Sequence, residues 1–191
     1  MKSSKISIIP FVFILLAFNF LSCNGQPLKQ EVESDIRNEG SDIQWISFED
    51  AISQSKDDPK KIFIDVYTSW CGWCKRMDQT TFKEETVVDY LNEKYYSVKL
   101  NAETRDTIEF RDVKFKYQPQ YKANELAVSL LGGKMGYPSY VILDENFNLM
   151  TQPVQSYLTK ENLMPILVFF GDKIHEDKTW EQFQSEMEGS K

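Results

Sequence analysis

The segment from Lys61 to Tyr67 (KIFIDVY) most constrains what this 191-residue chain can fold into. It is a nearly continuous run of apolar, β-favouring residues, interrupted by Asp65. Such a run is typical of a central strand that is buried on both faces, in a sheet covered by helices. The segment therefore predicts an α/β fold built around a strand at 61–67.

Apolar periodicity, capping residues and glycines mark the other expected elements. In chain order we expect a strand at 43–45, a helix at 48–52, the strand at 61–67, a helix from about 71 that bends near 80–81, a strand at 95–101, a strand or hairpin arm at 110–117, a helix at 124–131, strands at 139–143 and 149–150, and helices at 159–170 and 180–187. Pro165 is expected to kink the helix at 159–170. This order predicts an α/β sandwich with parallel strands first and an antiparallel hairpin last.

The first 22 residues differ from the rest of the chain. Lys2 and Lys5 precede an apolar run at 6–21, and small residues follow it. This pattern is typical of a secretory signal peptide, so we expect residues 1–22 to be removed on export. An uncleaved membrane anchor is the alternative, although the run is slightly short for a spanning helix.

Cys23 stands where the apolar run ends. With Phe20, Leu21 and Ser22 it resembles the cleavage box of a bacterial lipoprotein, which implies lipidation of Cys23 and a membrane anchor on the periplasmic side. The alternative is an incidental cysteine. The polar, acidic residues 23–41 are expected to form a flexible tether.

Net charge argues against nucleic acid as a partner. Removal of residues 1–22 lowers the basic count from 22 to 20 while the 29 acidic residues stay, so the net charge becomes 20 − 29 = −9. Phosphate neutralisation needs a basic surface, which this composition does not offer.

Cys71 and Cys74 form a Cys-x-x-Cys pair, a spacing found in zinc sites, haem attachment sites, redox dithiols and pairs of buried thiols. A zinc site needs about four nitrogen or sulfur ligands, and the chain adds only Cys23 and His175. Haem attachment needs a histidine directly after the second cysteine, where Lys75 stands. We therefore expect no metal or haem, while two inert buried thiols remain an alternative.

The turn from strand to helix favours redox chemistry at this pair. Gly72 and the turn are expected to put Cys71 at an exposed helix start, where the helix dipole and free N–H groups favour a thiolate. Cys74 follows one helical turn later, close enough for a disulfide. This arrangement makes Cys71 the attacking thiol and Cys74 the resolving thiol.

The stretch from Ile64 to Lys75 (IDVYTSWCGWCK) resembles the active-site strand and helix start of the thioredoxin superfamily. It is most similar to exported bacterial thioredoxin-like proteins with a Trp-Cys-Gly-Trp-Cys-Lys site followed by Met-Asp-x-x-Thr-Phe, here 77–82. The resemblance implies a thioredoxin-like three-layer sandwich with a central mixed sheet and helices on both faces. The match covers roughly Asp42 to Phe170. We expect a thioredoxin-like domain at 42–174, with an insertion at about 103–134 before a cis-proline, and a helical extension at 175–191.

The resemblance also implies roles for two charged residues. Asp65, six residues before Cys71, matches the family's buried acid, which would accept a proton from Cys74 as a general base. A carboxylate at a wet strand end is the alternative. Lys99 matches the lysine that supports this acid, and an ordinary edge lysine is its alternative.

The resemblance further implies a substrate-binding surface. Tyr137 and Pro138 match the cis-proline pair that faces the dithiol, where the backbone of Tyr137 would pair with a substrate strand. An ordinary trans proline is the alternative. Trp70 and Trp73 would frame the thiols with an apolar surface, although Trp70 also fits a purely packing role. The insertion is expected to cover or shape the substrate groove.

Together these residues predict an extracytoplasmic thiol–disulfide oxidoreductase that reduces protein disulfides through Cys71 and Cys74. It would need no metal or dissociable cofactor, and a redox partner protein, such as a membrane reductant, would supply its electrons. A thioredoxin-fold binding or chaperone module, in which the dithiol is secondary, is one alternative. A dithiol oxidase or isomerase, with the same chemistry run in the other direction, is another.

Overall fold

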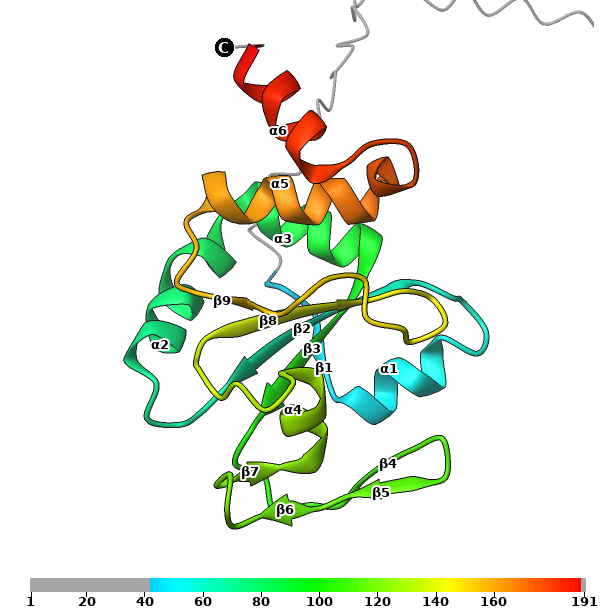
Figure 1. Cartoon of the computed structure of the whole chain (residues 1–191), viewed down its shortest axis with the longest axis vertical. Helices are drawn as coiled ribbons and strands as arrows, with labels where there is room; N and C mark the ends of the chain where they lie inside the picture. The colour runs from blue at the N-terminus through cyan, green and yellow to red at the C-terminus, as the bar shows by residue number, and fades with distance from the viewer. Residues whose placement is uncertain (1–41, 190–191) are drawn as a thin grey trace, which may run out of the picture. The chain divides into compact units, whose positions relative to one another are not determined.

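The computed structural model describes residues 42–189 (Figure 1). The expected signal peptide at 1–22, the expected tether at 23–41 and Cys23 lie outside the described residues. None of the helices between residues 42 and 189 is long and apolar enough to cross a membrane.

The central sheet is mixed and has the strand order β1-β3-β2-β8-β9. These strands are β1 (Trp45–Ile46), β2 (Lys61–Tyr67), β3 (Tyr95–Asn101), β8 (Ser139–Leu143) and β9 (Val154–Gln155). β1, β3 and β2 run parallel, whereas β8 is antiparallel to β2 and β9 is antiparallel to β8. The predicted change from parallel to antiparallel pairing is confirmed.

β2 is the central strand that its sequence predicts. It pairs with β3 on one side and β8 on the other, and six of its seven residues are buried. Phe63 points into one hydrophobic cluster, while Ile62 and Ile64 point into the cluster on the opposite face. Because successive side chains alternate between faces, a strand covered on both sides needs an apolar residue at almost every position.

Helices cover both faces of the sheet (Figure 1). One layer contains α2 (Gly72–Gln79), α3 (Glu85–Lys94), α5 (Lys160–Gly171) and α6 (Trp180–Gly189), with the short 3-10 helices η1 (Thr81–Lys83) and η2 (Ile174–Glu176). The other layer contains α1 (Phe48–Gln54) and α4 (Glu125–Leu130). Phe183 of α6 belongs to the same buried cluster as Leu167 of α5, so the C-terminal helix packs on the main core. The result is a three-layer α/β sandwich, as predicted.

Residues 103–134 form the insertion, which includes α4. They contain the hairpin β4 (Ile108–Phe110) and β5 (Val113–Phe115), and the pair β6 (Tyr117–Gln118) and β7 (Ala123–Asn124). Phe110 anchors the hairpin, with ring centroids 5.5 Å from Phe48 and 5.2 Å from Phe147. After α4, Gly132 and Gly133 adopt φ values of 59° and 77°, which favour glycine and explain this helix end.

Two local expectations were wrong. The helix expected from 71 onward is divided into α2, η1 and α3 rather than bent, because Thr80 has non-helical dihedral angles and Glu84 begins a new helix. The return strand expected at 149–150 forms only an isolated bridge between Leu143 and Leu149, and β9 pairs with β8 instead. α5 continues through Pro165 as one helix from Lys160 to Gly171, so the proline does not end it.

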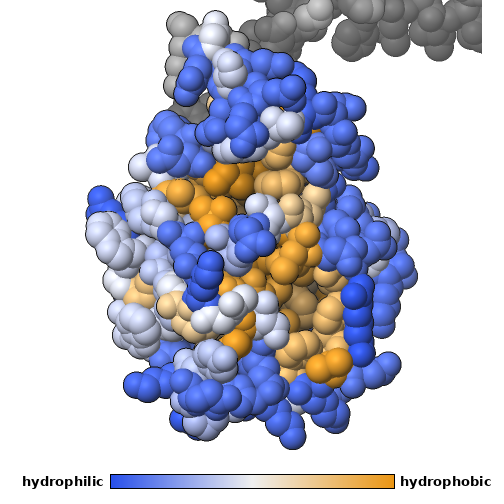
Figure 2. All heavy atoms as spheres, in the orientation of Figure 1, coloured by the Kyte–Doolittle hydropathy of each residue, from blue (hydrophilic) through white to orange (hydrophobic). Residues whose placement is uncertain are grey.

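Figure 2 shows apolar residues gathered on one face of the molecule and bordered by hydrophilic ones. A hollow of about 210 Å³ between α5, α6 and the segment before β9 is lined by Val154, Ile166, Phe169, Phe170 and Trp180, together with Thr151. Folded proteins normally keep apolar atoms on much of their surface. The hollow therefore does not by itself indicate a ligand site.

Gly171 provides a test of how α5 packs on α3 and β3. A Cβ at this position would lie 2.6 Å from Tyr90 Oη and 3.1 Å from Tyr95 Oη. Tyr95 cannot move away freely, because its hydroxyl donates to the Leu167 carbonyl at 2.7 Å inside the core. We expect Gly171→Ala to lower the free energy of unfolding by about 1–3 kcal/mol in urea denaturation, through overpacking.

Gly189→Ala is the matched control, because a Cβ there meets no atom within 4 Å. We expect its unfolding free energy to stay near that of the wild type. Equal stability of the two variants would contradict the close packing of Gly171 against the tyrosines.

Candidate functional site

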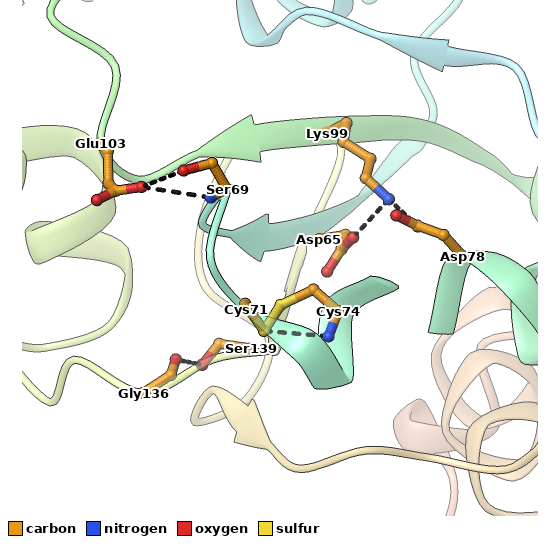
Figure 3. Close-up of a disulfide and its surroundings, with 9 residues drawn as sticks. All are labelled: Asp65, Ser69, Cys71, Cys74, Asp78, Lys99, Glu103, Gly136 and Ser139. Atoms are coloured by element: carbon orange, nitrogen blue, oxygen red, sulfur yellow. Dashed lines mark hydrogen bonds and ion pairs between the residues drawn. A yellow bond between two sulfur atoms is a disulfide. The ribbon is translucent and has the colours of Figure 1, made fainter. Parts of the chain in front are cut away.

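The end of β2 and the start of α2 bring the two cysteines together. Residues 68–70 form a turn after the strand, in which the Cys71 amide donates to the Thr68 carbonyl at 3.2 Å. Cys71 is then the N-cap residue of α2. Cys71 and Cys74 form a disulfide, and Cys71 Sγ accepts a hydrogen bond from the Cys74 amide at 3.0 Å (Figure 3). The helix N-terminus therefore directs an N–H group at the first sulfur, which favours a thiolate there when the bond is reduced.

The expectation of an exposed Cys71 was wrong. Only 4% of Cys71 and 2% of Cys74 are accessible to solvent. The exposed surface at this end of α2 belongs to the neighbouring tryptophans instead, since Trp70 is 67% and Trp73 is 63% exposed. The disulfide is therefore approached across an aromatic surface.

Asp65 lies deep beneath this surface, on β2. Its side chain is 1% exposed, and its Oδ2 lies 3.1 Å from Lys99 Nζ. The register places Asp65 opposite Lys99 on β3 and opposite Tyr140 on β8. In Figure 3 the carboxyl group lies between the Lys99 ammonium and the disulfide. The structure therefore excludes a carboxylate at a wet strand end.

Burial raises the pKa of Asp65 to about 6, from an ordinary value of 3.8. The ammonium of Lys99 opposes this shift, and the negative charge of Asp78 adds to it. Desolvation is the largest of these effects because the charged carboxylate loses its hydration at this position. A carboxyl group with a pKa near neutrality can both accept and donate a proton at physiological pH.

Lys99 is not an ordinary edge lysine. It contacts Asp65 on one side and Asp78 of α2 on the other, so it links β2, β3 and α2 (Figure 3). Its ammonium also lies 4.8 Å from the ring centre of Trp45. These contacts hold the lysine at the buried acid.

The peptide bond between Tyr137 and Pro138 is cis, as predicted. The Tyr137 ring packs edge-on against Trp70 at 5.9 Å. Trp70 is in turn held by Glu103, because its indole Nε1 donates to Glu103 Oε1 at 3.0 Å. The other oxygen of Glu103 accepts hydrogen bonds from the amide and hydroxyl groups of Ser69. Trp70 is therefore fixed by a hydrogen bond and by packing, although it is largely exposed.

A groove of about 620 Å³ lies next to α2 and the cis-proline. It is lined by Trp73, Gly136, Tyr137, Pro138, Gln155, Ser156 and Tyr157. The rings of Trp73 and Tyr157 lie 5.5 Å apart, and no lining residue carries a full charge at neutral pH. The lining comes from α2, the cis-proline loop and the β9 segment. The insertion at 103–134 supplies no lining residue, but its first residue, Glu103, holds Trp70 against Tyr137 of the lining.

Three residues of the site were not singled out from the sequence. Asp78 lies inside the Met-Asp-x-x-Thr-Phe motif, so the motif was a signal in the sequence for this residue. Glu103 follows β3 by two residues and is 33 positions from Trp70, and Tyr157 is more distant still in sequence. Their contacts depend on which chain segments meet in the fold, which no local pattern shows.

Comparison with known proteins places this geometry in a wider context. The Thioredox_DsbH family model, described as "Protein of unknown function, DUF255", matches residues 30–189. Spermatogenesis-associated protein 20 of Rattus norvegicus is 31% identical over 68 residues, 35% of this chain and 9% of that protein. An uncharacterized protein of Caenorhabditis elegans is 28% identical over 75 residues, 39% of this chain and 10% of its own length. The chain thus spans about a tenth of the length of these relatives.

Two solved structures are similar to this chain. A thioredoxin-fold protein from Helicobacter pylori has a TM-score of 0.52 and 15% identity, covering 78% of this chain and 87% of that one. A DsbH oxidoreductase has a TM-score of 0.49 and 17% identity, covering 74% and 91%. At these identities the first likeness shows the fold alone, and that fold is the thioredoxin fold.

Proposed function

This chain belongs to the Thioredox_DsbH family, and we propose that it is a protein thiol–disulfide oxidoreductase acting through Cys71 and Cys74. The observation that carries the proposal is a disulfide at the N-terminus of α2, above a buried acid with a pKa of about 6 and beside an uncharged groove. Inert buried thiols would need neither the acid nor the groove.

In the reducing direction the reaction has two steps. The Cys71 thiolate attacks a substrate disulfide, forms a mixed disulfide and releases one substrate thiolate, which takes up a proton. The Asp65 carboxylate then accepts the thiol proton of Cys74, and the Cys74 thiolate attacks Cys71 Sγ. The Cys71–Cys74 disulfide forms, and the second substrate thiolate leaves with the proton from Asp65. Two electrons and two protons pass to the substrate.

The groove is the proposed binding site for the substrate polypeptide. An extended segment next to Tyr137 would present its disulfide to Cys71, while its side chains meet Trp73 and Tyr157. The absence of a charged side chain from the lining favours uncharged segments. No dissociable cofactor takes part in these steps, and a dithiol protein must return two electrons to the disulfide after each cycle.

We also propose that the protein works outside the cytoplasm. The signal-like residues 1–22 and the lipoprotein-like Cys23 support this location and a lipid anchor on the periplasmic side of a membrane. In that compartment a membrane reductant is a suitable electron donor. Labelling of the full chain with a fatty acid, and its loss in Cys23→Ser, is the test.

Trp73 offers a test of the groove. Tryptophan is among the residue types most enriched at positions where truncation weakens binding by more than about 1 kcal/mol. We therefore expect Trp73→Ala to raise the KM for an unfolded protein disulfide about fivefold to tenfold. The rate with hydroxyethyl disulfide, a small disulfide with no peptide segment to lie along the groove, should change less.

Tyr121→Ala is the matched control, because Tyr121 is an exposed aromatic residue of the insertion and does not line the groove. We expect its KM to match that of the wild type. Equal effects of the two variants would argue against substrate binding at Trp73.

Insulin reduction driven by dithiothreitol tests the proposed function directly. The wild-type protein should reduce insulin well above the uncatalysed rate, and Cys71→Ser should lower the rate to that background. The Cys71–Cys74 reduction potential, measured against glutathione mixtures, then gives the direction, since about 30 mV corresponds to about 1.4 kcal/mol for two electrons. A wild-type protein that does not reduce insulin would overturn the proposal. If, in addition, Cys71→Ser/Cys74→Ser binds unfolded proteins as tightly as the wild type, the result would favour a binding module.

A further inference from the structure

Two carboxylates of very different exposure share the ammonium group of Lys99. Asp65 is 1% exposed and lies 3.1 Å from Lys99 Nζ. Asp78 is 42% exposed and makes the closer contact with the same nitrogen. Figure 3 shows Lys99 between the two acids, with the disulfide on the far side of Asp65. The Lys99 ammonium therefore pairs with both Asp78 and the buried Asp65.

The remaining surroundings of Lys99 are aromatic rather than anionic. Its ammonium lies 4.8 Å from the ring centre of Trp45 and 5.4 Å from those of Tyr67 and Phe82. Within residues 42–189, Asp65 and Asp78 are its only ion-pair partners. The charge balance at this position is consequently one cation against two carboxylates.

The other elements packed around Asp65 add no formal charge. Tyr140 faces it from β8, and both burial and the charge of Asp65 raise the pKa of the Tyr140 phenol, so that group stays neutral. α2 contributes Asp78 and the disulfide, and β3 contributes Lys99. The charge state of Asp65 is therefore set by its burial, by Lys99 and by Asp78.

A lysine paired with a single buried carboxylate would hold that carboxylate in its ionised form. A second carboxylate on the same ammonium weakens this effect, because it draws the ammonium toward itself and repels the first negative charge. Asp78 can pair with the Lys99 ammonium at a small desolvation cost, because its side chain is partly exposed to water. Its position on α2, one turn after Cys74, brings the second charge to the site together with the dithiol helix.

We propose that Asp78 is a positioning residue for proton transfer at the dithiol: by holding Lys99, it leaves the Asp65 carboxyl group free to exchange the proton of Cys74. This inference rests on the proposed oxidoreductase function. Asp78 itself touches neither substrate nor sulfur in this role. In the resolving step the proton leaves Cys74 for Asp65 and then passes to the departing substrate thiolate.

The alternative is that the contact between Asp78 and Lys99 only fastens α2 to β3. That role would affect stability but would not move the titration of Asp65. The distinguishing measurement is a ¹³C NMR titration of the Asp65 side-chain carboxyl group in the reduced full chain, with the signal assigned by its loss in Asp65→Asn. This readout requires no substrate, so it is independent of catalytic activity.

In Asp78→Asn the Asp65 titration midpoint should fall by about half to one pH unit, because one anion is removed and Lys99 is left to pair with Asp65. In single-turnover measurements, the rate of the resolving step rises with pH as Asp65 ionises. The midpoint of this rise should move to lower pH by the same amount. Asp78→Glu restores the charge and should return both midpoints toward the wild-type value. Asp89→Asn, at an exposed position of α3, removes an equal charge elsewhere and should leave them in place.

Each result bears on the proposal separately from the proposed function. An unchanged Asp65 midpoint in Asp78→Asn and in the second variant Asp78→Ser would overturn the positioning role, even if the wild type is an active reductase. If the Asp65 midpoint shifts in Asp78→Asn but the wild type has no reductase activity, the sharing of Lys99 by the two carboxylates would be supported. The proposed oxidoreductase function would then be rejected. An equal shift of the Asp65 midpoint in Asp89→Asn would mean that the change in the protein's net charge causes the shift. This result would also overturn the inference.

Discussion

A Cys74→Ala variant should hold its substrate as a covalent adduct on Cys71. Cys71 caps α2 and accepts the Cys74 amide hydrogen bond, so it is the sulfur that the helix N-terminus favours as a thiolate. Without Cys74, the mixed disulfide on Cys71 lacks the neighbouring thiol that would resolve it. We expect multiple-turnover insulin reduction to fall to background, while a species with the mass of protein plus substrate accumulates under non-reducing conditions.

Cys71→Ala is the matched comparison for this trap. It should lose the same multiple-turnover activity but should accumulate no adduct, because the remaining Cys74 lies inside α2 and does not have the position at the helix N-terminus that favours a thiolate. The adduct of Cys74→Ala should also disappear when dithiothreitol is added. Equal trapping by both variants would contradict the assignment of Cys71 as the attacking thiol. The trapped polypeptides would identify the substrates by mass.

The central strand and the dithiol turn were predictable because their signals are local. β2 must be apolar at nearly every position to be buried on both faces, and the match with Lys61–Tyr67 is complete. The resemblance to thioredoxins further indicated the cis bond at Tyr137–Pro138. In each of these regions, one short segment carries the information that determines its structure.

The parts that were missed depend on contacts between distant segments. Thr80 ends α2 where its hydroxyl bonds to Arg76 and contacts Tyr157, 77 residues away, and the Thr81 hydroxyl donates to the Leu158 carbonyl. The burial of Cys71 and the sharing of Lys99 by Asp65 and Asp78 arise in the same way. Helix propensity and motif spacing do not report such contacts, because both describe a segment in isolation.

Asp65→Asn should slow the resolving step by about 100-fold. The amide cannot accept the Cys74 proton, and loss of a positioned general base typically costs 10²–10⁴-fold. The attack of Cys71 on substrate should change much less, because it precedes this proton transfer. Rapid-mixing measurements with a preformed mixed disulfide separate the two steps. In the wild type the rate should rise with pH through about 6 as Asp65 ionises, and this limb should be absent from Asp65→Asn.

The same substitution should make the protein more stable at pH 7. The pKa of Asp65 is about 6 in the folded protein and 3.8 for an ordinary aspartate, so the folded state binds this proton more tightly than the unfolded chain. Its contribution is therefore fully favourable below about pH 4 and is lost as the pH rises through 6. At pH 7 the buried carboxylate costs on the order of 2–3 kcal/mol, which an uncharged side chain of the same shape avoids.

Urea denaturation of the reduced protein at pH 4 and pH 7 checks this sign. Asp65→Asn should gain about 1–3 kcal/mol over the wild type at pH 7, and clearly less at pH 4, where the wild-type carboxyl is protonated as well. Asp57→Asn, at an exposed turn after α1, should show neither gain nor slower resolution. If Asp65→Asn slows the resolving step but gains no stability at pH 7, Asp65 would take part in proton transfer without destabilising the fold when it is ionised. A gain in stability with normal resolution would remove Asp65 from the proton transfer, because the step would then proceed without an ionisable carboxyl group at this position.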